Sequence, residues 1–121
     1  MEVKRRMAIR PELWLTPLHR VEWASAIAQH LFRGSLSVQG TQKAYDAFEL
    51  HRDIGLWIEV PLPETTFELT VRLARIHAPS LGCRTLDILH VAAALELGAK
   101  EFWTFDERQA KLAKAVGLKV S

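Results

Sequence analysis

The sequence predicts an α/β domain with a mostly parallel sheet. Short apolar runs with strand character alternate with helical patterns of about ten to sixteen residues, the order typical of parallel sheets. The chain has 121 residues, which suits one domain with one core that needs no disulfide. Its hydrophobic share of 49% and charged share of 25% are ordinary for a soluble globular protein. We therefore expect a single domain over residues 1–121.

The composition excludes several classes of protein. No apolar run approaches the roughly 18 residues that a membrane span needs, so no membrane partner is expected. The start "MEVKRRMAIR" is basic but has no apolar segment after it, so it does not resemble a secretory signal. The single cysteine, Cys83, cannot form an internal disulfide and is compatible with a cytoplasmic location. A net charge of +2 is compatible with a nucleic-acid partner without identifying one.

A strand and a helix are predicted at the start of the chain. The apolar run "LWLT" (13–16) suits a short buried strand. Thr16 and Pro17 then provide an N-cap and a first helical residue for a helix over 17–32. Apolar residues recur along this helix three and four positions apart, and Gly34 is its natural stop.

A second helix and a second strand follow. Ser37 opens a helical pattern that ends near Gly55 and is weakened in its first turn by Gly40. The run "LWIEVPLP" (56–63) alternates between apolar and polar residues and then meets two prolines. It predicts a strand that ends at Pro61, because proline cannot donate a hydrogen bond to a neighbouring strand.

The C-terminal half continues the alternation. The segment 64–78, "ETTFELTVRLARIHA", predicts a helix, and "PSLGC" (79–83) predicts a loop. The next helix, over 85–97, is apolar almost all the way round, which is typical of a buried helix, and Gly98 closes it. The run "EFWTF" (101–105) predicts a strand.

A short helix and a short strand complete the predicted fold. "DERQAKLAKAVG" (106–117) suits a helix with Gly117 as its cap, and "LKV" (118–120) suits a final strand. In parallel sheets, ligands bind outside the carboxyl ends of the strands. Asp106 stands at the carboxyl end of the strand over 101–105, so it is a candidate for a functional site.

Three acids have a simple structural explanation and a chemical one. Asp87 lies in the first turn of the apolar helix, where the helix N-terminus favours negative charge. Asp106 suits the N-cap of the helix that follows it. Glu22 lies one turn into its helix, where a solvated glutamate is ordinary. His90, three residues after Asp87, is expected to be a packed histidine rather than a metal ligand. A shared function requires the acids to converge.

The segment "RTLDILHVAAALELGAKEFWTFDERQAKLAKAVGLKV" (84–120) resembles the C-terminal half of PIN-domain ribonucleases, above all the VapC-type toxins of toxin–antitoxin pairs. The segment "LTPLHRVEWASAI" (15–27) resembles the acid-bearing helix of that family. The resemblance implies a PIN-like three-layer α/β/α fold with a mostly parallel sheet. The family's first, central strand, which reads like "YLDTSALV" and carries an aspartate, is absent from this chain. We therefore expect a domain that is N-terminally shortened relative to the family.

The resemblance implies a metal-dependent endoribonuclease that hydrolyses RNA phosphodiesters with Mg²⁺ or Mn²⁺. Glu22, Asp87 and Asp106 match the family's acids, so they are the implied metal ligands and catalytic residues. Asp106 or Asp87 would help to position the attacking water. Thr104 matches a small polar residue near the acids. Arg84 could reach a carboxylate or an RNA phosphate, or simply cap its loop.

The implied partners are RNA, an antitoxin and a second copy of the chain. Arg108 and Lys111 are candidate contacts for RNA phosphates, although an ordinary solvated helix face is the favoured explanation for each. By resemblance, helices 17–32 and 37–54 would hold the antitoxin as an apolar helix in a groove. The alternative function is a catalytically impaired PIN-like binding module that holds an antitoxin or a dimer partner. The missing first aspartate favours this alternative.

Overall fold

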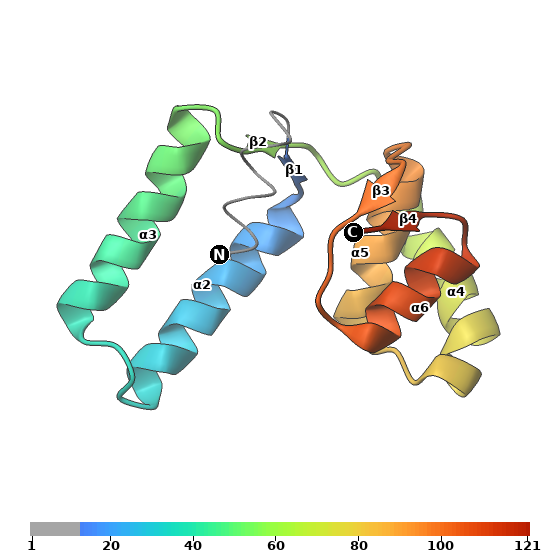
Figure 1. The fold of residues 1–121 in the computed structure, drawn as a ribbon, viewed down its shortest axis with the longest axis horizontal. Helices are drawn as coiled ribbons and strands as arrows, with labels where there is room; N and C mark the ends of the chain where they lie inside the picture. The colour runs from blue at the N-terminus through green and yellow to red at the C-terminus, as the bar shows by residue number, and fades with distance from the viewer. Residues whose placement is uncertain (1–12) are drawn as a thin grey trace. The chain divides into compact units, whose positions relative to one another are not determined.

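A computed structural model describes residues 13–121 and divides the chain into two compact units. The N-terminal unit extends to Pro61, and the C-terminal unit covers Leu62–Ser121 (Figure 1). Each unit contains helices and one two-stranded parallel sheet. The α/β class is confirmed, whereas the three-layer arrangement and the single domain stay predictions. No helix within residues 13–121 has the length and apolar character to cross a membrane.

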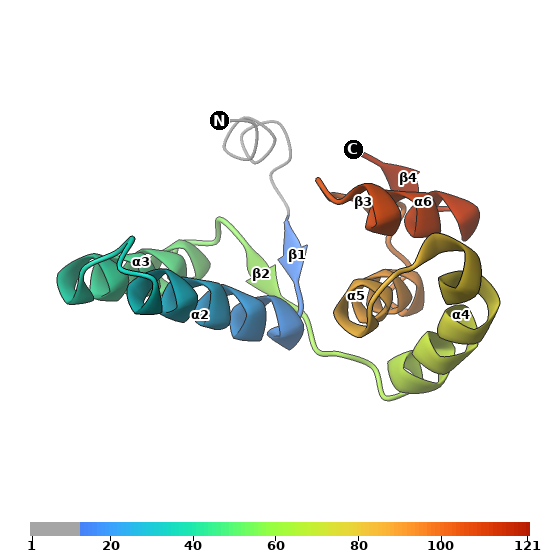
Figure 2. The same ribbon diagram turned by 90° about the horizontal axis from the view of Figure 1, so that it is seen from below.

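The N-terminal unit is a helical hairpin whose open end carries two short strands (Figure 2). Its elements are β1 (Trp14–Leu15), α2 (Pro17–Phe32), α3 (Val38–Asp53) and β2 (Ile58–Glu59). The predicted N-cap Thr16 is confirmed, and Ser37, where the second helix was predicted to open, is also an N-cap. Leu18 N donates to Thr16 Oγ1 at 3.2 Å, and Gly40 N donates to Ser37 Oγ at 2.9 Å. Since each cap satisfies a backbone donor that the helix leaves open, both helices begin where the sequence predicts.

Few apolar side chains of this unit are buried. Among its described residues, only Ile27 and Trp57 are buried hydrophobic side chains. Val21 and Phe32, which belong to the apolar side of α2, are 66% and 92% exposed. The helical spacing was therefore predicted correctly, but most of the apolar stripe on α2 lies at the surface. An exposed apolar surface of this kind is typical of an interaction site.

The C-terminal unit contains three helices and the second sheet. Its elements are α4 (Thr65–Leu81), α5 (Thr85–Glu96), β3 (Glu101–Phe102), α6 (Glu107–Ala115) and β4 (Lys119–Val120). The core includes Leu73 from α4, Val91 and Ala92 from α5, Leu112 from α6 and Leu118. All six residues of α5 from Ile88 to Ala93 are buried, as the apolar sequence of this helix predicts.

The predicted loop over 79–83 is wrong at its start. Helix α4 continues through Pro79 to Leu81 and ends at Gly82, whose φ of 68° is left-handed. A proline inside a helix removes one backbone hydrogen bond, which is why the sequence favoured a stop. Ala78 and Leu81 pack against the core, and this burial offsets the lost bond.

The predicted strand over 101–105 is shorter in the structure. Only Glu101 and Phe102 are paired, with Lys119 and Val120 of β4. Beyond them the chain turns, and Asp106 N donates to Thr104 Oγ1 at 3.0 Å. This side-chain hydrogen bond replaces sheet pairing and directs the chain into α6.

Candidate active site

Asp87 lies in the first turn of α5 and stabilises the start of this helix. Arg84 N donates to Asp87 Oδ2 at 3.4 Å, and Ile88 N donates to Arg84 O at 3.1 Å. Arg84 is the N-cap residue of α5, and its side chain is exposed. The structural explanation for both residues is therefore confirmed. Asp87 is only partly buried at the N-terminus of α5, so its carboxylate can also take part in chemistry.

Asp106 is the N-cap of α6, as its sequence position predicts. Gln109 N donates to Asp106 Oδ1 at 2.9 Å, which satisfies one of the open donors of the helix. Thr104 lies beside Asp106, because the Thr104 hydroxyl accepts the hydrogen bond from Asp106 N. The carboxylate of Asp106 is exposed at the carboxyl side of β3, close to the position expected for a ligand site in an α/β protein.

The Gln109 side chain forms hydrogen bonds near both acids. Its side chain is buried, with the residue 9% exposed. Gln109 Nε2 donates to Asp87 O at 3.2 Å, and Gln109 Oε1 accepts from Thr104 Oγ1 at 2.7 Å. Gln109 was not among the candidates predicted from the sequence. The spacing of Asp106 and Gln109 matches a helix-capping pattern, which could have indicated a backbone role but not the contact with α5.

The Cys83 thiol lies within the electrostatic reach of both acids. Burial raises the pKa of Cys83 above its ordinary value, and the carboxylates of Asp87 and Asp106 raise this pKa further. Cys83 Sγ donates to Arg108 O at 3.4 Å. Both carboxylates therefore act electrostatically on the buried thiol that lies just before α5.

The two acids offer the ligand chemistry of a hard divalent cation. Mg²⁺ and Mn²⁺ favour oxygen ligands, and Mg²⁺ usually keeps several waters while using one or two carboxylates. The carboxylates of Asp87 and Asp106 are therefore ligands of the type that such an ion prefers. Within residues 13–121, neither unit brings three His, Cys, Asp or Glu side chains together as a metal site. Glu22 lies half-buried on α2 of the N-terminal unit, so the grouping of all three acids stays a prediction.

The remaining candidates of the C-terminal unit lie as their sequence predicts. His90 is buried in α5 with 8% exposure, which confirms that it is packed. Arg108 and Lys111 are exposed on α6. Arg108 lies in the first turn, which Asp106 caps, and Lys111 lies one turn later. Their exposure suits contact with RNA phosphates and an ordinary solvated face alike.

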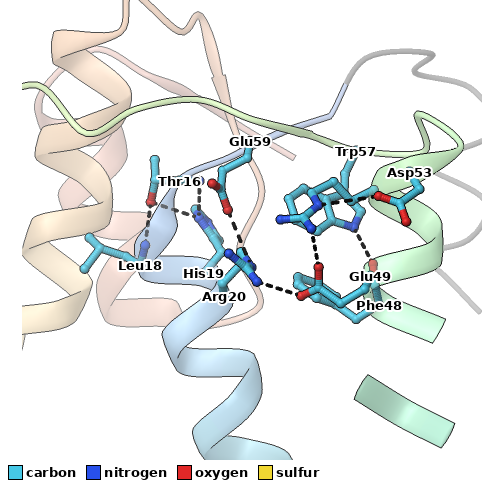
Figure 3. Close-up of polar contacts among 10 residues, drawn as sticks. Thr16, Leu18, His19, Arg20, Phe48, Glu49, Asp53, Trp57 and Glu59 are labelled. Atoms are coloured by element: carbon cyan, nitrogen blue, oxygen red, sulfur yellow. Dashed lines mark hydrogen bonds and ion pairs between the residues drawn. The ribbon is translucent and has the colours of Figure 1, made fainter. Parts of the chain in front are cut away.

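Ion pairs hold the N-terminal unit together where α2, α3 and β2 meet (Figure 3). Arg20 Nη2 lies 2.9 Å from Glu49 Oε1, and Arg20 Nε lies 3.6 Å from Glu59 Oε1. Arg52 Nη2 contacts Glu49 Oε2 at 2.7 Å. The hydrogen bond with Glu49 raises the pKa of Arg20 above its ordinary value. This network was not predicted from the sequence, because Arg20 is distant in the chain from both Glu49 and Glu59.

A pocket of about 340 Å³ lies between α2 and α3. Its lining includes the aromatic side chains of Trp23 and Phe48, whose ring centroids are 5.1 Å apart in a stacked arrangement. Tyr45 Oη donates to Ala24 O at 3.1 Å and links the two helices. The pocket lies on the helical pair that was predicted to hold a partner. It is lined by Pro17, Arg20, Val21, Trp23, Ala24, Tyr45, Phe48 and Glu49.

A family model described as the PIN domain matches residues 1–115. The chain therefore belongs to the PIN domain family. PIN domains are α/β proteins and are generally nucleases, which typically use divalent metal ions. Comparisons with curated proteins and with solved structures found no match.

Proposed function

We propose that this PIN-domain protein is a metal-dependent endoribonuclease and the toxin of a toxin–antitoxin pair, related to the VapC type. One observation carries the proposal. In the C-terminal unit, Asp87 and Asp106 come from different helix starts and are connected through the buried carboxamide of Gln109. A purely structural pair of N-terminal acids would need no such connection, because each acid caps its own helix.

In the proposed reaction, Asp87 and Asp106 would hold Mg²⁺ or Mn²⁺, and Glu22 is the proposed third carboxylate. A divalent cation held there would make its bound water more acidic and would neutralise charge that develops on the phosphate. Asp106 or Asp87 orients the attacking water and accepts its proton. Water oxygen bonds to phosphorus, the bond from phosphorus to the leaving oxygen breaks, and that oxygen takes up a proton. Arg108 and Lys111, both exposed on α6, hold the neighbouring phosphates of the RNA.

The proposed protein partners are an antitoxin and a second copy of the chain, in the cytoplasm. The antitoxin would place an apolar helix on α2 and α3. The pocket between these helices and the exposed side chains of Val21, Trp23 and Phe32 support this proposal. A helix that covers these side chains would remove their apolar surface from water. The N-terminal unit leaves that surface exposed.

The test is cleavage of RNA by the purified chain with Mg²⁺ or Mn²⁺. Asp87→Asn and Asp106→Asn should each lower the cleavage rate about 100-fold or more, because the loss of one negatively charged oxygen ligand weakens metal binding and transition-state stabilisation. Asparagine still caps a helix, so both variants should fold. Glu107→Gln is the matched control, since Glu107 is an exposed acid beside Asp106, and it should keep wild-type activity.

The alternative function is a PIN-like binding module without catalysis. The observation that favours it is that, among residues 13–121, no three His, Cys, Asp or Glu side chains come together as a metal site. It predicts that the wild type dimerises or binds an antitoxin helix but cuts no RNA with either metal. Cleavage that Asp87→Asn leaves unchanged would contradict the nuclease proposal, because the activity would then come from a contaminant.

A further inference from the structure

We infer that Gln109 is a positioning residue that sets the spacing between Asp87 and Asp106. This inference rests on the proposed function, because the spacing matters for catalysis only if the two acids share a cation. Gln109 touches neither substrate nor metal in this proposal. It acts through the backbone of Asp87, the hydroxyl of Thr104 and the carboxylate of Asp106.

The connection is continuous from one helix start to the other. Gln109 Nε2 donates to Asp87 O at 3.2 Å, which fixes the carboxamide to the first turn of α5. Gln109 Oε1 accepts from Thr104 Oγ1 at 2.7 Å, and the same hydroxyl accepts from Asp106 N at 3.0 Å. Three hydrogen bonds therefore join the backbone of Asp87 to the backbone of Asp106.

Gln109 also orients the carboxylate of Asp106 directly. Its backbone N donates to Asp106 Oδ1 at 2.9 Å. A carboxylate has two oxygens, so a bond that holds Oδ1 also sets the direction of Oδ2. The backbone of Asp87 and the carboxylate of Asp106 are thus both hydrogen-bonded to one buried residue.

The Gln109 side chain does more than cap α6. In a capping box, the third helical residue accepts a hydrogen bond directly from the N–H of the N-cap residue. Here the Thr104 hydroxyl takes the N–H of Asp106 and passes the interaction to Gln109 Oε1. This arrangement leaves Gln109 Nε2 available for Asp87 O on another helix. A residue that only capped α6 would not need that second contact.

The chemistry of the site requires a glutamine. The position needs a donor and an acceptor at once, which a carboxamide provides. An ionised glutamate cannot donate to Asp87 O, and it would add a third negative charge beside two carboxylates. Methionine has a similar shape without either polar group, so it would leave buried partners unsatisfied. Small errors in the placement of reacting groups are costly for catalysis.

The first experiment needs no metal. Amide hydrogen exchange is followed by NMR in the full chain for wild type, Gln109→Met, Thr104→Val and Val91→Ala. Val91 is fully buried in the core, and its side chain takes part in none of the hydrogen bonds of the network, so Val91→Ala destabilises the unit without removing any of them. After correction for global stability, the Asp106 amide should exchange about tenfold faster in Gln109→Met than in Val91→Ala. Equal exchange in these two variants would overturn the inference.

The second experiment measures Mn²⁺ affinity by calorimetry on the same four proteins. Gln109→Met and Thr104→Val should weaken binding about 10- to 100-fold, the usual effect of losing a group that orients a metal ligand. Val91→Ala should bind as the wild type does, because it leaves the hydrogen bonds between the two helix starts in place. Thr104→Val keeps Gln109 itself, so it remains informative if Gln109→Met does not fold.

The outcomes separate the inference from the proposed function. Wild-type affinity in both network variants would overturn the positioning role while leaving the nuclease proposal intact. A wild type that binds no Mn²⁺ would overturn the proposed function and the catalytic part of the inference together. In that case, faster exchange of the Asp106 amide in Gln109→Met would still support the structural link between the two acids.

Discussion

Asp106 combines a structural role and a chemical one that can be separated by substitution. Its Oδ1 caps α6, and its negative charge is the feature that a cation would need. Serine caps a helix about as well as aspartate but carries no charge. Alanine provides neither property. A pair of substitutions at this one position therefore distinguishes the two roles.

We expect Asp106→Ser to retain the free energy of unfolding within about 0.5 kcal/mol, whereas Asp106→Ala should lose roughly 0.5–2 kcal/mol through the missing cap. Both variants should lose the stabilisation that millimolar Mn²⁺ gives the wild type. Urea denaturation with and without Mn²⁺ measures both effects. If Asp106→Ser is stabilised by Mn²⁺ as strongly as the wild type, Asp106 is not a metal ligand.

Cys83 predicts a loss of stability at high pH. Burial and the carboxylates of Asp87 and Asp106 raise the pKa of Cys83 in the folded protein. The thiol therefore ionises at a lower pH in the unfolded chain, and stability falls as pH rises above the unfolded pKa of about 8.5. Denaturation midpoints between pH 7 and pH 10 should show this fall in the wild type. Cys83→Ala is the control and should show a smaller pH dependence over the same range.

At the residue scale, the sequence located side chains that act near their own position. Asp87, Asp106 and Thr104 were identified because helix starts and strand ends have local signals. Gln109 and the pairing of Arg20 with Glu49 were not identified. Both depend on contacts between elements, and a periodic pattern does not specify which distant group a polar side chain meets.

The end of α4 shows how one glycine sets the boundary of an element. Gly82 follows the helix with a φ of 68°, and Gly82 N donates to Ala78 O at 2.8 Å. Nothing lies within 4 Å of the position that a β-carbon would occupy. Any effect of a larger residue here therefore comes from backbone strain and not from a clash.

We expect Gly82→Ala to destabilise the protein by about 1–2 kcal/mol, the cost of a left-handed conformation for a residue with a β-carbon. Gly82→Asn should cost less, because asparagine tolerates this conformation better. Thermal or urea denaturation of the two variants measures the difference. Equal stabilities for alanine and asparagine would show that backbone strain at Gly82 is not the cause.

At the element scale, the sequence predicted every described helix and strand but not all of their ends. Helix α2 has the predicted bounds because Thr16 and Pro17 are strong local signals. Helix α4 continues past Pro79, since packing of its last turn outweighs a local preference. Strand β3 is shorter than predicted because pairing depends on the partner strand and not on the apolar run alone.

The two units differ in how much core each contains. The C-terminal unit has a connected cluster of eight buried residues from Leu73 to Leu118. The N-terminal unit, over its described residues, buries the apolar side chains of Ile27 and Trp57. Burial of apolar surface is the main favourable contribution to folding, so the two units should differ in independent stability.

We expect a fragment of residues 62–121 to fold alone, with marginal stability and cooperative unfolding, because it retains its core. A fragment of residues 1–61 should show helical content below that of the full chain and no cooperative transition. Circular dichroism with thermal denaturation tests both. Cooperative unfolding of the N-terminal fragment alone would show that surface ion pairs such as Arg20–Glu49 contribute more than is usual.

The sequence by itself determined the order and type of the elements, the caps of α2, α3 and α6, and the two acids at the starts of α5 and α6. These features follow from local chemistry, because caps, helical periodicity and chain turns involve residues close in the sequence. Only the tertiary structure decided that Gln109 joins Asp87 to Asp106 and that the apolar side of α2 is left largely exposed. Both features depend on which elements meet in space, and that choice is made by packing across the whole unit.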